Sequence, residues 1–251
     1  MTLFYNGKLE DKLYNQEHFT KFLNSGDFER PTTISFVNPY SYKILTSKNK
    51  EICEQIDYWY SDGGLLCKLV NLSKKNKINR VSFDFSSIAE DVFLTCLDKK
   101  YKIIIIGGTD SEIKSFSKYV SSKYIGLDIC FYRNGYFNKR TELDETILKI
   151  VTLEPDIVIA GLGTPLQESF IIDLCKKMNN KSLLFTCGGF ITQTCMGKDF
   201  YHPLIKRWGL RWLQRAVQQR HVRSRLLKHY PIFIVGYSID IFLLYLKRKK
   251  I

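Results

Sequence analysis

Two charged residues near short apolar segments have the chemistry that group transfer needs. Asp62 follows an aromatic run at 57–60 and precedes a glycine pair, and its carboxylate could accept a proton as a general base. Arg80 closes a basic cluster further along the chain, and the fork of a guanidinium matches the oxygens of a phosphate group. The alternative for Asp62 is an ordinary turn, which the residues alone favour. The alternative for the cluster at Arg80 is a solvated basic face.

Two strand–glycine–helix turns provide places where a phosphate could bind. Residues 156–160 and 102–106 are short, mostly apolar and rich in β-branched side chains, as buried strands are. Backbone N–H groups and the positive end of a helix dipole converge after such a strand and can hold an anion. Neither turn has the full dinucleotide fingerprint or the P-loop lysine, so a tight turn without a ligand is the alternative. The glycines are Gly161 and Gly163 in the first turn and Gly107 and Gly108 in the second.

Signals for the start of a helix follow both glycine turns. Thr164 is expected to cap one helix, with Pro165 in its first position and Gln167 at the spacing of a capping box. Thr109 has the same spacing to an acidic residue and predicts a helix over about 110–120. Both helices would therefore point their amino ends at the glycines.

The alternation of strands, turns and helices between residues 102 and 189 predicts the fold class. Further strands are expected at 32–37, 125–132 and 182–186. This pattern is typical of a Rossmann-like α/β fold with a doubly wound, mainly parallel sheet, which binds ligands at the carboxyl edge of its strands. We divide the chain into an α/β core over residues 1–203 and a basic, amphipathic C-terminal appendage over residues 204–251.

Composition is that of a cytosolic globular protein. With 251 residues, 45% of them hydrophobic, the chain is large enough for a full core. Its first residues include acids and lack a long apolar run, so no secretory signal is expected. The seven cysteines are scattered and none forms C-x-x-C, which favours reduced core thiols over disulfides or a zinc site. No run reaches the roughly 18 consecutive apolar residues of a transmembrane helix.

The net charge of +13 is concentrated in the C-terminal fifth of the chain. Residues 201–251 contain twelve Lys or Arg and a single acid, Asp240, whereas the preceding body is nearly neutral. An apolar run at 231–246 lies between an arginine-rich segment and the basic C-terminus. Apolar area with a basic rim is typical of a monotopic element at a membrane surface. A buried C-terminal helix with a solvated lysine tail is the alternative.

These motifs, in this order over about residues 32–230, resemble those of the WecG/TagA/CpsF glycosyltransferases, glycosyltransferase family 26. The motif GLGTPLQE, which ends in Gln167 and Glu168, is the most specific of them. The sequence departs from the family pattern at several positions, among them Phe36, so the transferred sugar is not implied. The other residues that carry the resemblance are Asn38, Asp62, Arg80, Gly107, Gly108, Gly135, Tyr136, Phe137, Gly188, Gly189, Phe190, Gly197, Pro203 and the segment at 209–215.

The resemblance implies an enzyme that moves a sugar from a UDP-sugar to a polyprenyl-diphosphate-linked acceptor sugar. Such enzymes act in the synthesis of bacterial cell-surface polysaccharide, namely teichoic acid, capsule or exopolysaccharide. The resemblance further implies inversion at the sugar, no metal or other cofactor, and a peripheral location on the cytoplasmic face of the cell membrane. The lack of an Asp-x-Asp motif to hold a divalent ion agrees with this. Nucleic acid is not expected as a partner, and a homo-oligomer is compatible with the resemblance.

The resemblance also assigns roles to individual residues. Asp62 matches the proposed base, and Arg80 matches an active-site arginine that would meet the diphosphate together with the amide dipoles of the glycine turns. Asn38 is expected to touch a sugar, with simple turn formation as its alternative. Gln167 matches an active-site glutamine, although a capping box would need no catalysis. The remaining residues expected to bind substrate are Gly107, Gly108, Gly135, Tyr136, Phe137, Gly161, Gly163, Glu168, Arg215 and Arg220.

Two other classes of protein share part of this pattern. A nicotinamide or flavin enzyme on a Rossmann sheet would need the full glycine fingerprint followed by an acid, and the chain has no such fingerprint. A nucleic-acid-binding protein could use the arginine-rich tail, whose aromatic side chains could stack on bases. The apolar run at 231–246 would have no purpose in such a protein. The glycosyltransferase is therefore the favoured interpretation.

Overall fold

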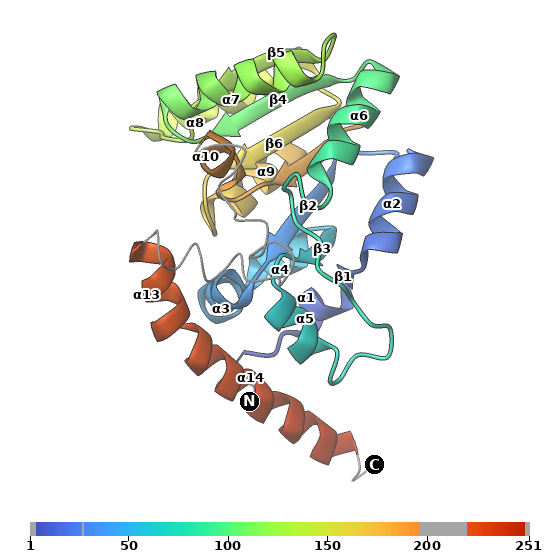
Figure 1. The fold of residues 1–251 in the computed structure, drawn as a ribbon, viewed down its shortest axis with the longest axis vertical. Coiled ribbons are helices and arrows are strands. Elements are labelled where there is room, and N and C mark those ends of the chain that lie inside the picture. The colour runs from blue at the N-terminus through green and yellow to red at the C-terminus, as the bar shows by residue number, and fades with distance from the viewer. Residues whose placement is uncertain (1–3, 27, 196–219, 249–251) are drawn as a thin grey trace.

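The computed structural model of the chain describes residues 4–26, 28–195 and 220–248, and these form one sheet with helices on both faces (Figure 1). The strands are β1 (Leu13–Tyr14), β2 (Thr32–Val37), β3 (Tyr58–Ser61), β4 (Lys102–Gly107), β5 (Asp128–Arg133), β6 (Ile157–Gly161) and β7 (Leu183–Thr186). The helices are α1 (Gly7–Asp11), α2 (Gln16–Ser25), α3 (Pro39–Lys48), α4 (Lys50–Gln55), α5 (Gly64–Val70), α6 (Ala89–Lys99), α7 (Asp110–Lys123), α8 (Arg140–Leu153), α9 (Leu166–Cys175), α10 (Phe190–Cys195), α13 (Arg220–Lys228) and α14 (Tyr230–Arg248).

The sheet confirms the predicted Rossmann-like, doubly wound α/β fold. Its strand order over the described residues is β1-β3-β2-β7-β6-β4-β5, and all of these neighbours pair in parallel. In β4, Ile103 and Ile105 pack into one cluster of the core while Ile104 and Ile106 pack into the other. Burial of both faces explains why this strand is an unbroken apolar run in the sequence.

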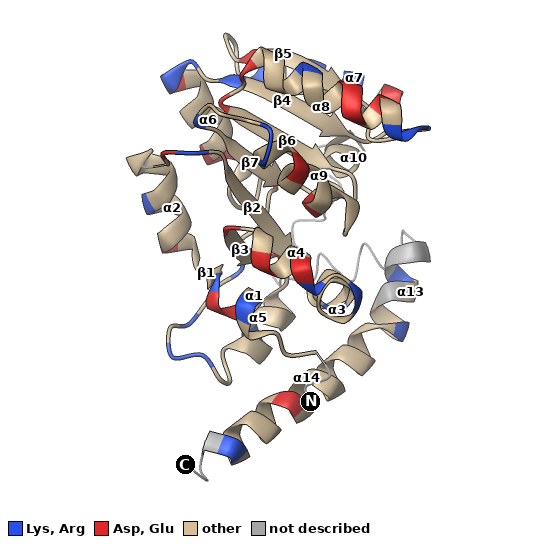
Figure 2. Ribbon diagram, turned by 180° about the vertical axis from the view of Figure 1, so that it is seen from behind, with Lys and Arg blue, Asp and Glu red and all other residues tan. Residues whose placement is uncertain are grey.

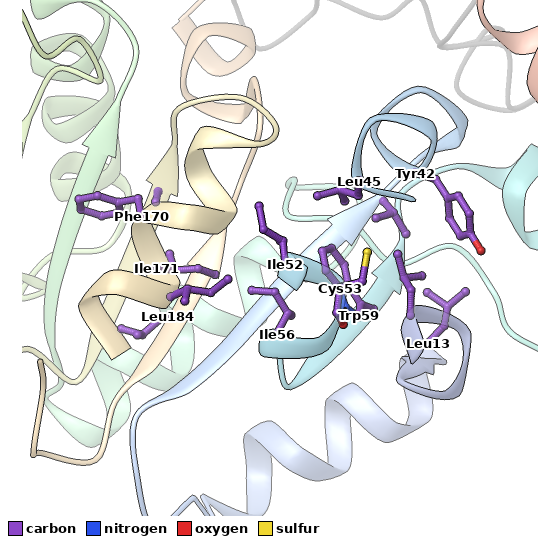
Figure 3. Packing of buried hydrophobic residues seen from close by; sticks show 14 of the residues in the cluster. Leu13, Tyr42, Leu45, Ile52, Cys53, Ile56, Trp59, Phe170, Ile171 and Leu184 are labelled. Carbon is purple, nitrogen blue, oxygen red and sulfur yellow. Dashed lines mark hydrogen bonds between the residues drawn. The ribbon is translucent and has the colours of Figure 1, made fainter. Parts of the chain in front are cut away.

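Helices cover the two faces of the sheet in two layers. Helices α3, α4, α5, α8, α9 and α14 contribute to the core on one face, and α2, α6, α7 and α10 contribute on the other. Figure 3 shows part of the first layer, where Trp59 of β3 lies beside α4. The indole N–H of this fully buried side chain donates to the carbonyl oxygen of Cys53 at 3.3 Å. The sheet between these layers is the rigid body that positions the strand ends.

Helix α14 packs on this body through one of its faces. Phe233 and Tyr237 are fully buried, in the same cluster as residues of α3 and α5. The buried carboxylate of Asp240 accepts hydrogen bonds from the backbone N–H groups of Phe4 and Tyr5 at 2.5 and 2.8 Å. The predicted boundary of the appendage at residue 204 lies outside the described residues. Within them, α14 is joined to the core and to the N-terminal segment.

A buried carboxyl group lies beneath α14 and strengthens this attachment. The hydroxyls of Tyr42 and Tyr237 both donate to Oε1 of Glu10. Burial raises the pKa of the Glu10 carboxyl above its ordinary value, although the two hydroxyls and Lys74 act in the opposite sense. The inner face of α14 is thus held by specific polar partners as well as by apolar packing.

The opposite face of α14 is apolar and exposed. Its large side chains recur at helical spacing, so that they form one stripe along the helix. Monomeric soluble proteins rarely expose large contiguous apolar patches, which indicates that a partner covers this face. Figure 2 shows the helix without charge except for one acidic position near its middle and basic positions at its C-terminal end, while further basic positions lie on α13. The residues that are 41–62% exposed are Ile232, Val235, Ile239, Phe242, Leu243, Tyr245 and Leu246.

By length and composition, the stretch Leu226–Lys247 could cross a membrane. The stretch is not an unbroken apolar run, because polar residues such as Ser238 and Asp240 interrupt it. Its mean hydropathy nevertheless reaches 1.4. Burial on the core describes the inner face of this segment, and contact of its outer face with a membrane stays a prediction.

Candidate active site

Most of the residues to which the sequence points lie at the carboxyl edge of the sheet, because the carboxyl ends of parallel strands all lie at that edge. Each strand from β2 to β7 ends at such a residue or within two positions of one. Neighbouring strands lie about 4.8 Å apart, so the strand order sets the spacing between these positions. The residues are Asn38 after β2, Asp62 after β3, Gly107 and Gly108 at β4, Gly135 after β5, Gly161 and Gly163 at β6, and Gly188 after β7.

The glycines of β4 and β6 lie side by side where the strand order reverses. Gly107 pairs with Gly161 across the two strands. Strand β4 leads outward to β5 and β6 leads to β7 on its other side, so this is a topological switch point, where open α/β sheets bind ligands. A Cβ on Gly107 would lie 2.7 Å from the carbonyl oxygen of Gly161. The backbones approach this closely because neither residue has a side chain. Gly135 joins them by donating its N–H to the Gly108 oxygen at 2.9 Å.

The helix that follows β4 begins as predicted. Thr109 is its N-cap, and Oγ1 of this residue accepts a hydrogen bond from the Glu112 N–H at 3.3 Å. The Glu112 carboxylate in turn accepts from the Thr109 N–H at 2.7 Å, which completes the capping box. A carboxylate therefore already occupies the amino end of α7.

The helix that follows β6 begins differently from the prediction. Pro165 is the N-cap of α9, and no side chain caps the helix. The predicted capping box between Thr164 and Gln167 is wrong, because the Thr164 hydroxyl donates to Glu168 at 3.2 Å instead. No side chain accepts from the first N–H groups of α9, and the carboxyl group in its first turn, Glu168, is buried, so these N–H groups are better placed for an anion than those of α7.

Asp62 and Arg80 lie together with a second carboxylate at the end of β3. Nη2 of Arg80 is 3.2 Å from Oδ1 of Asp62 and 2.5 Å from Oδ2 of Asp84. We call these three residues the acid–arginine cluster. Ser82 donates from Oγ to the Asp84 carboxylate at 2.5 Å, and Ser86 donates to its other oxygen. Two carboxylates thus share one guanidinium.

Backbone pairing holds this cluster at the strand ends. The N–H of Asp62 donates to the Val37 oxygen at the end of β2, at 2.8 Å, and the N–H of Val81 donates to the Ser61 oxygen of β3, also at 2.8 Å. The segment carrying Arg80 therefore continues the sheet beside β3. The side chains of Asp62 and Arg80 are 34% and 35% exposed, so the cluster is open to a substrate.

Charge pairing controls ionisation in the cluster. Burial opposes ionisation of Asp84, but Arg80 and the Ser82 and Ser86 hydroxyls outweigh it and hold the pKa of Asp84 below its ordinary value. Burial likewise opposes the charge on Arg80, whereas Asp62 and Asp84 raise the pKa of the guanidinium above its ordinary value. Asp84 was not among the residues selected from the sequence. The feature that could have pointed to Asp84 is an Asx turn, in which the Ser86 N–H donates to Asp84 Oδ1 at 2.8 Å.

Asn38 borders the cluster and caps a helix. Its Oδ1 accepts from the N–H groups of Tyr40 and Ser41 at 3.0 and 3.2 Å, and Ser41 Oγ accepts from the Asn38 N–H at 3.0 Å. A Cβ on Gly63 would lie 3.5 Å from the Asn38 Cβ, which places Asn38 beside the Asp62 turn. The structural role of Asn38 is thus present, and its contact with a sugar stays a prediction.

The two aromatic residues after β5 have different surroundings. The side chain of Tyr136 is 66% exposed. Phe137 lies under the guanidinium of Arg133, 4.2 Å from its carbon to the ring centroid, and near the ring of Phe170. Of this pair, Tyr136 is the one whose side chain a ligand at the edge could touch.

The other residues predicted to bind substrate have side chains that are either buried or outside the described part of the structure. Gln167 is 3% exposed and Glu168 is 0% exposed, so both lie beneath the edge rather than on it. Arg220 begins α13, but its side chain is outside the described part of the structure. Arg215 lies wholly outside the described residues.

The described residues offer no ready metal site. Among them, no three His, Cys, Asp or Glu side chains gather in a way that could hold an ion. All seven cysteines are described, and all are free thiols, as the sequence pattern predicts.

Comparison with known proteins identifies relatives of this chain. A model of the glycosyl transferase WecG/TagA/CpsF family matches residues 11–246. The chain is 47% identical over 204 residues to UDP-Gal:alpha-D-GlcNAc-diphosphoundecaprenol beta-1,4-galactosyltransferase of Shigella boydii, across 81% of this chain and 84% of the relative. It is 21% identical over 185 residues to N-acetylglucosaminyldiphosphoundecaprenol N-acetyl-beta-D-mannosaminyltransferase of Staphylococcus aureus (strain MW2), across 73% of this chain and 70% of the relative.

The lowered pKa of Asp84 predicts a pH-dependent effect of Asp84→Asn on stability. A group whose pKa is depressed by folding stabilises the protein above its unfolded pKa, and that contribution is lost as pH falls through the folded pKa. At neutral pH we expect the variant to lose about 1.5–3 kcal/mol, the usual range for hydrogen bonds to charged groups. Thermal unfolding measured from about pH 7 down to about pH 3 should show this gap closing. The exposed Asp98→Asn is the matched control. A gap that is constant with pH would contradict the ion pair.

Proposed function

Because the chain belongs to the glycosyl transferase WecG/TagA/CpsF family, and is therefore a glycosyltransferase, we propose that it transfers galactose from UDP-galactose to a lipid-linked acceptor. The proposed acceptor is N-acetylglucosamine on undecaprenyl diphosphate, and the proposed product is a β-1,4 linkage. The observation that carries this proposal is the 47% identity to the Shigella boydii galactosyltransferase over most of both chains. The product would serve the synthesis of a bacterial cell-surface polysaccharide.

The spacing of the strands divides the proposed site into two ends. Three strand spacings, roughly 15 Å, separate the end of β3 from the end of β6. The acid–arginine cluster and the turn after β6 are therefore too far apart to hold the same phosphate. The two regions instead suit the two substrates of a transfer reaction, with one region for each substrate. We assign the diphosphate of the donor to the turn after β6, where Gly163 precedes the uncapped helix α9, and the acceptor hydroxyl to the cluster.

The proposed reaction is a single displacement. A hydroxyl of the acceptor N-acetylglucosamine attacks the anomeric carbon of galactose from the face opposite the leaving group. The bond from that carbon to the diphosphate oxygen breaks, and its electron pair leaves with UDP. The carboxylate of Asp62 takes the proton of the attacking hydroxyl as a general base. The α-linked sugar of UDP-galactose thereby becomes β-linked, which agrees with the inversion implied by the sequence.

The geometry favours an orienting role for Arg80. Of the two carboxylates, Asp84 is the closer to Arg80 at 2.5 Å, while Asp62 lies at 3.2 Å, and Nη2 of Arg80 also donates to Ser82 Oγ. Because the second carboxylate takes the closer position, the guanidinium can fix the direction of Asp62 without neutralising it completely. Asp84 is then the group that prevents Arg80 from forming a closed ion pair with the base.

Charge on the departing diphosphate is met by dipoles and arginines in this proposal. The start of α9 supplies the positive end of a helix dipole. Arg215 and Arg220 belong to the arginine-rich segment and are the proposed cations. The sequence has no Asp-x-Asp motif, so we propose a metal-independent reaction.

We place the protein on the cytoplasmic face of the cell membrane, with α14 lying along the surface. A helix that crosses the bilayer could not keep Phe233, Tyr237 and Asp240 packed on the core. The exposed apolar stripe of α14, with the basic residues at its C-terminal end and on α13, supplies the two signals of interfacial binding. This arrangement would hold the catalytic edge near the headgroup of a lipid-linked acceptor.

The proposed activity is tested by transfer of labelled galactose to lipid-linked N-acetylglucosamine. The wild-type protein should use UDP-galactose in preference to UDP-N-acetylmannosamine and should retain activity in EDTA. Asp62→Asn should lose about 10²–10⁴-fold in kcat, because only the base is removed. The exposed Asp98→Asn is the matched control and should behave as wild type. Turnover of Asp62→Asn near the wild-type rate would remove Asp62 from this role. Loss of activity in EDTA that Mg²⁺ restores would contradict metal independence.

Membrane binding by the outer face of α14 is tested by flotation with anionic liposomes. The double variant Ile239→Glu/Phe242→Glu places charge on the apolar stripe and should abolish flotation, because burial of charge in the interface is unfavourable. Ser238→Glu adds charge at an exposed polar position of the same helix and should reduce flotation much less. Unchanged flotation of the double variant would show that another surface binds the membrane.

A further inference from the structure

Glu168 combines complete burial with a carboxyl oxygen that has no partner. It lies in the first turn of α9 and is 0% exposed. Its Oε1 accepts hydrogen bonds from Ser35 Oγ at 3.0 Å, Thr164 Oγ1 at 3.2 Å and Gln167 Nε2 at 2.9 Å. Its Oε2 is buried and has no hydrogen-bond partner among the described residues. Such an oxygen in a native fold needs an explanation.

The partners of this carboxyl connect three strands at the centre of the edge. Ser35 belongs to β2 and is hydrogen-bonded to Thr186 of β7 at 2.8 Å, while Thr164 follows β6. Gln167 extends the network, because its Oε1 accepts from the Gly188 N–H in the turn after β7, at 3.1 Å. Strands β2 and β7 lie between the acid–arginine cluster and the glycine turns. The network therefore spans the boundary between the two ends of the site.

The surroundings of Glu168 favour its neutral form. Its described partners are hydroxyl and amide groups, and none of them carries a charge. Burial raises the pKa of Glu168, and the hydrogen bonds to its carboxyl only partly oppose this. The titratable group that faces it from α4 is the thiol of Cys53, whose pKa burial raises to about 12, so that it is also neutral. An ionised carboxylate here would lack the counter-charge that buried charges require.

We propose that Glu168 is a protonated carboxylic acid in the folded protein and is a positioning residue that holds the turns after β6 and β7 against β2. The proton lies on Oε2, because Oε1 is already surrounded by three donors. In this form the carbonyl oxygen fixes Thr164 and Gln167, and Gln167 in turn fixes Gly188. The consequence for catalysis rests on the proposed function: the donor turn is held at a set distance from the acid–arginine cluster.

The first test measures protonation without any assay of activity. A carboxyl whose pKa is raised by folding contributes its full stability below its unfolded pKa and loses it as pH rises through the folded pKa. Glu168→Gln keeps the shape and the acceptor oxygen but cannot ionise. The Tm of this variant should therefore rise relative to that of the wild type as pH increases from about 5 to about 8. A difference in Tm that does not change with pH would overturn the proposal.

The second test separates positioning from participation of the carboxyl in the reaction. Glu168→Gln should lose far less kcat than Glu168→Ala, because it reproduces the shape and the acceptor oxygen of the neutral acid. Glu168→Ala should lose on the order of 10²-fold in kcat with little change in KM for the donor, because a displaced turn misaligns the reactants. If Glu168→Gln is as impaired as Glu168→Ala, the proposal is wrong. A wild-type protein without transferase activity would instead contradict the proposed function, and the Tm comparison would still decide the protonation of Glu168.

Discussion

Burial of the parallel sheet on both of its faces determines where polar groups can lie in this fold. The core strands β4 and β6 carry fully buried aliphatic side chains on both sides, so they can present polar groups and open backbone only at their ends. Because the described strands run parallel, their carboxyl ends meet at one edge. The order of the strands then determines the chemistry that can be combined there. It puts Asp62 and Arg80 at the end of β3 and a glycine junction at β4 and β6.

A site built on strand ends also requires the strands to keep their spacing. Most of this rigidity comes from the two apolar layers, and part comes from polar contacts at the edge itself. Ser35 and Thr186 join β2 to β7, and Glu168 adds the turn after β6. Helix α14 belongs to the same body, since Asp240 binds the N-terminal backbone. Its outer apolar face therefore has a fixed direction relative to the carboxyl edge of the sheet, which suits the proposed lipid-linked acceptor.

Features that depend on local sequence could be predicted, and those that depend on tertiary contacts could not. Strands β4 and β6 follow from apolar runs, and the Thr109 capping box follows from residue spacing. The equivalent box at Thr164 has the same spacing, but the buried Glu168 four residues later competes for its hydroxyl. Asp84 was missed although it lies four residues from Arg80, because only the fold shows that the Arg80 guanidinium joins it to Asp62. The docking of α14 could not be read from its composition, since its buried and exposed faces are equally apolar apart from Asp240.

In the proposed complex, one substrate pair extends along the edge, with the donor diphosphate at the turn after β6 and the acceptor hydroxyl at the acid–arginine cluster. The most direct measurement is a crystal structure of the full chain with bound UDP. We expect the diphosphate at the start of α9, against Gly163. The end of the diphosphate that carries galactose in UDP-galactose should be directed toward Asp62. A diphosphate bound to Arg80, with the glycine junction empty, would contradict the division of the site into these two ends.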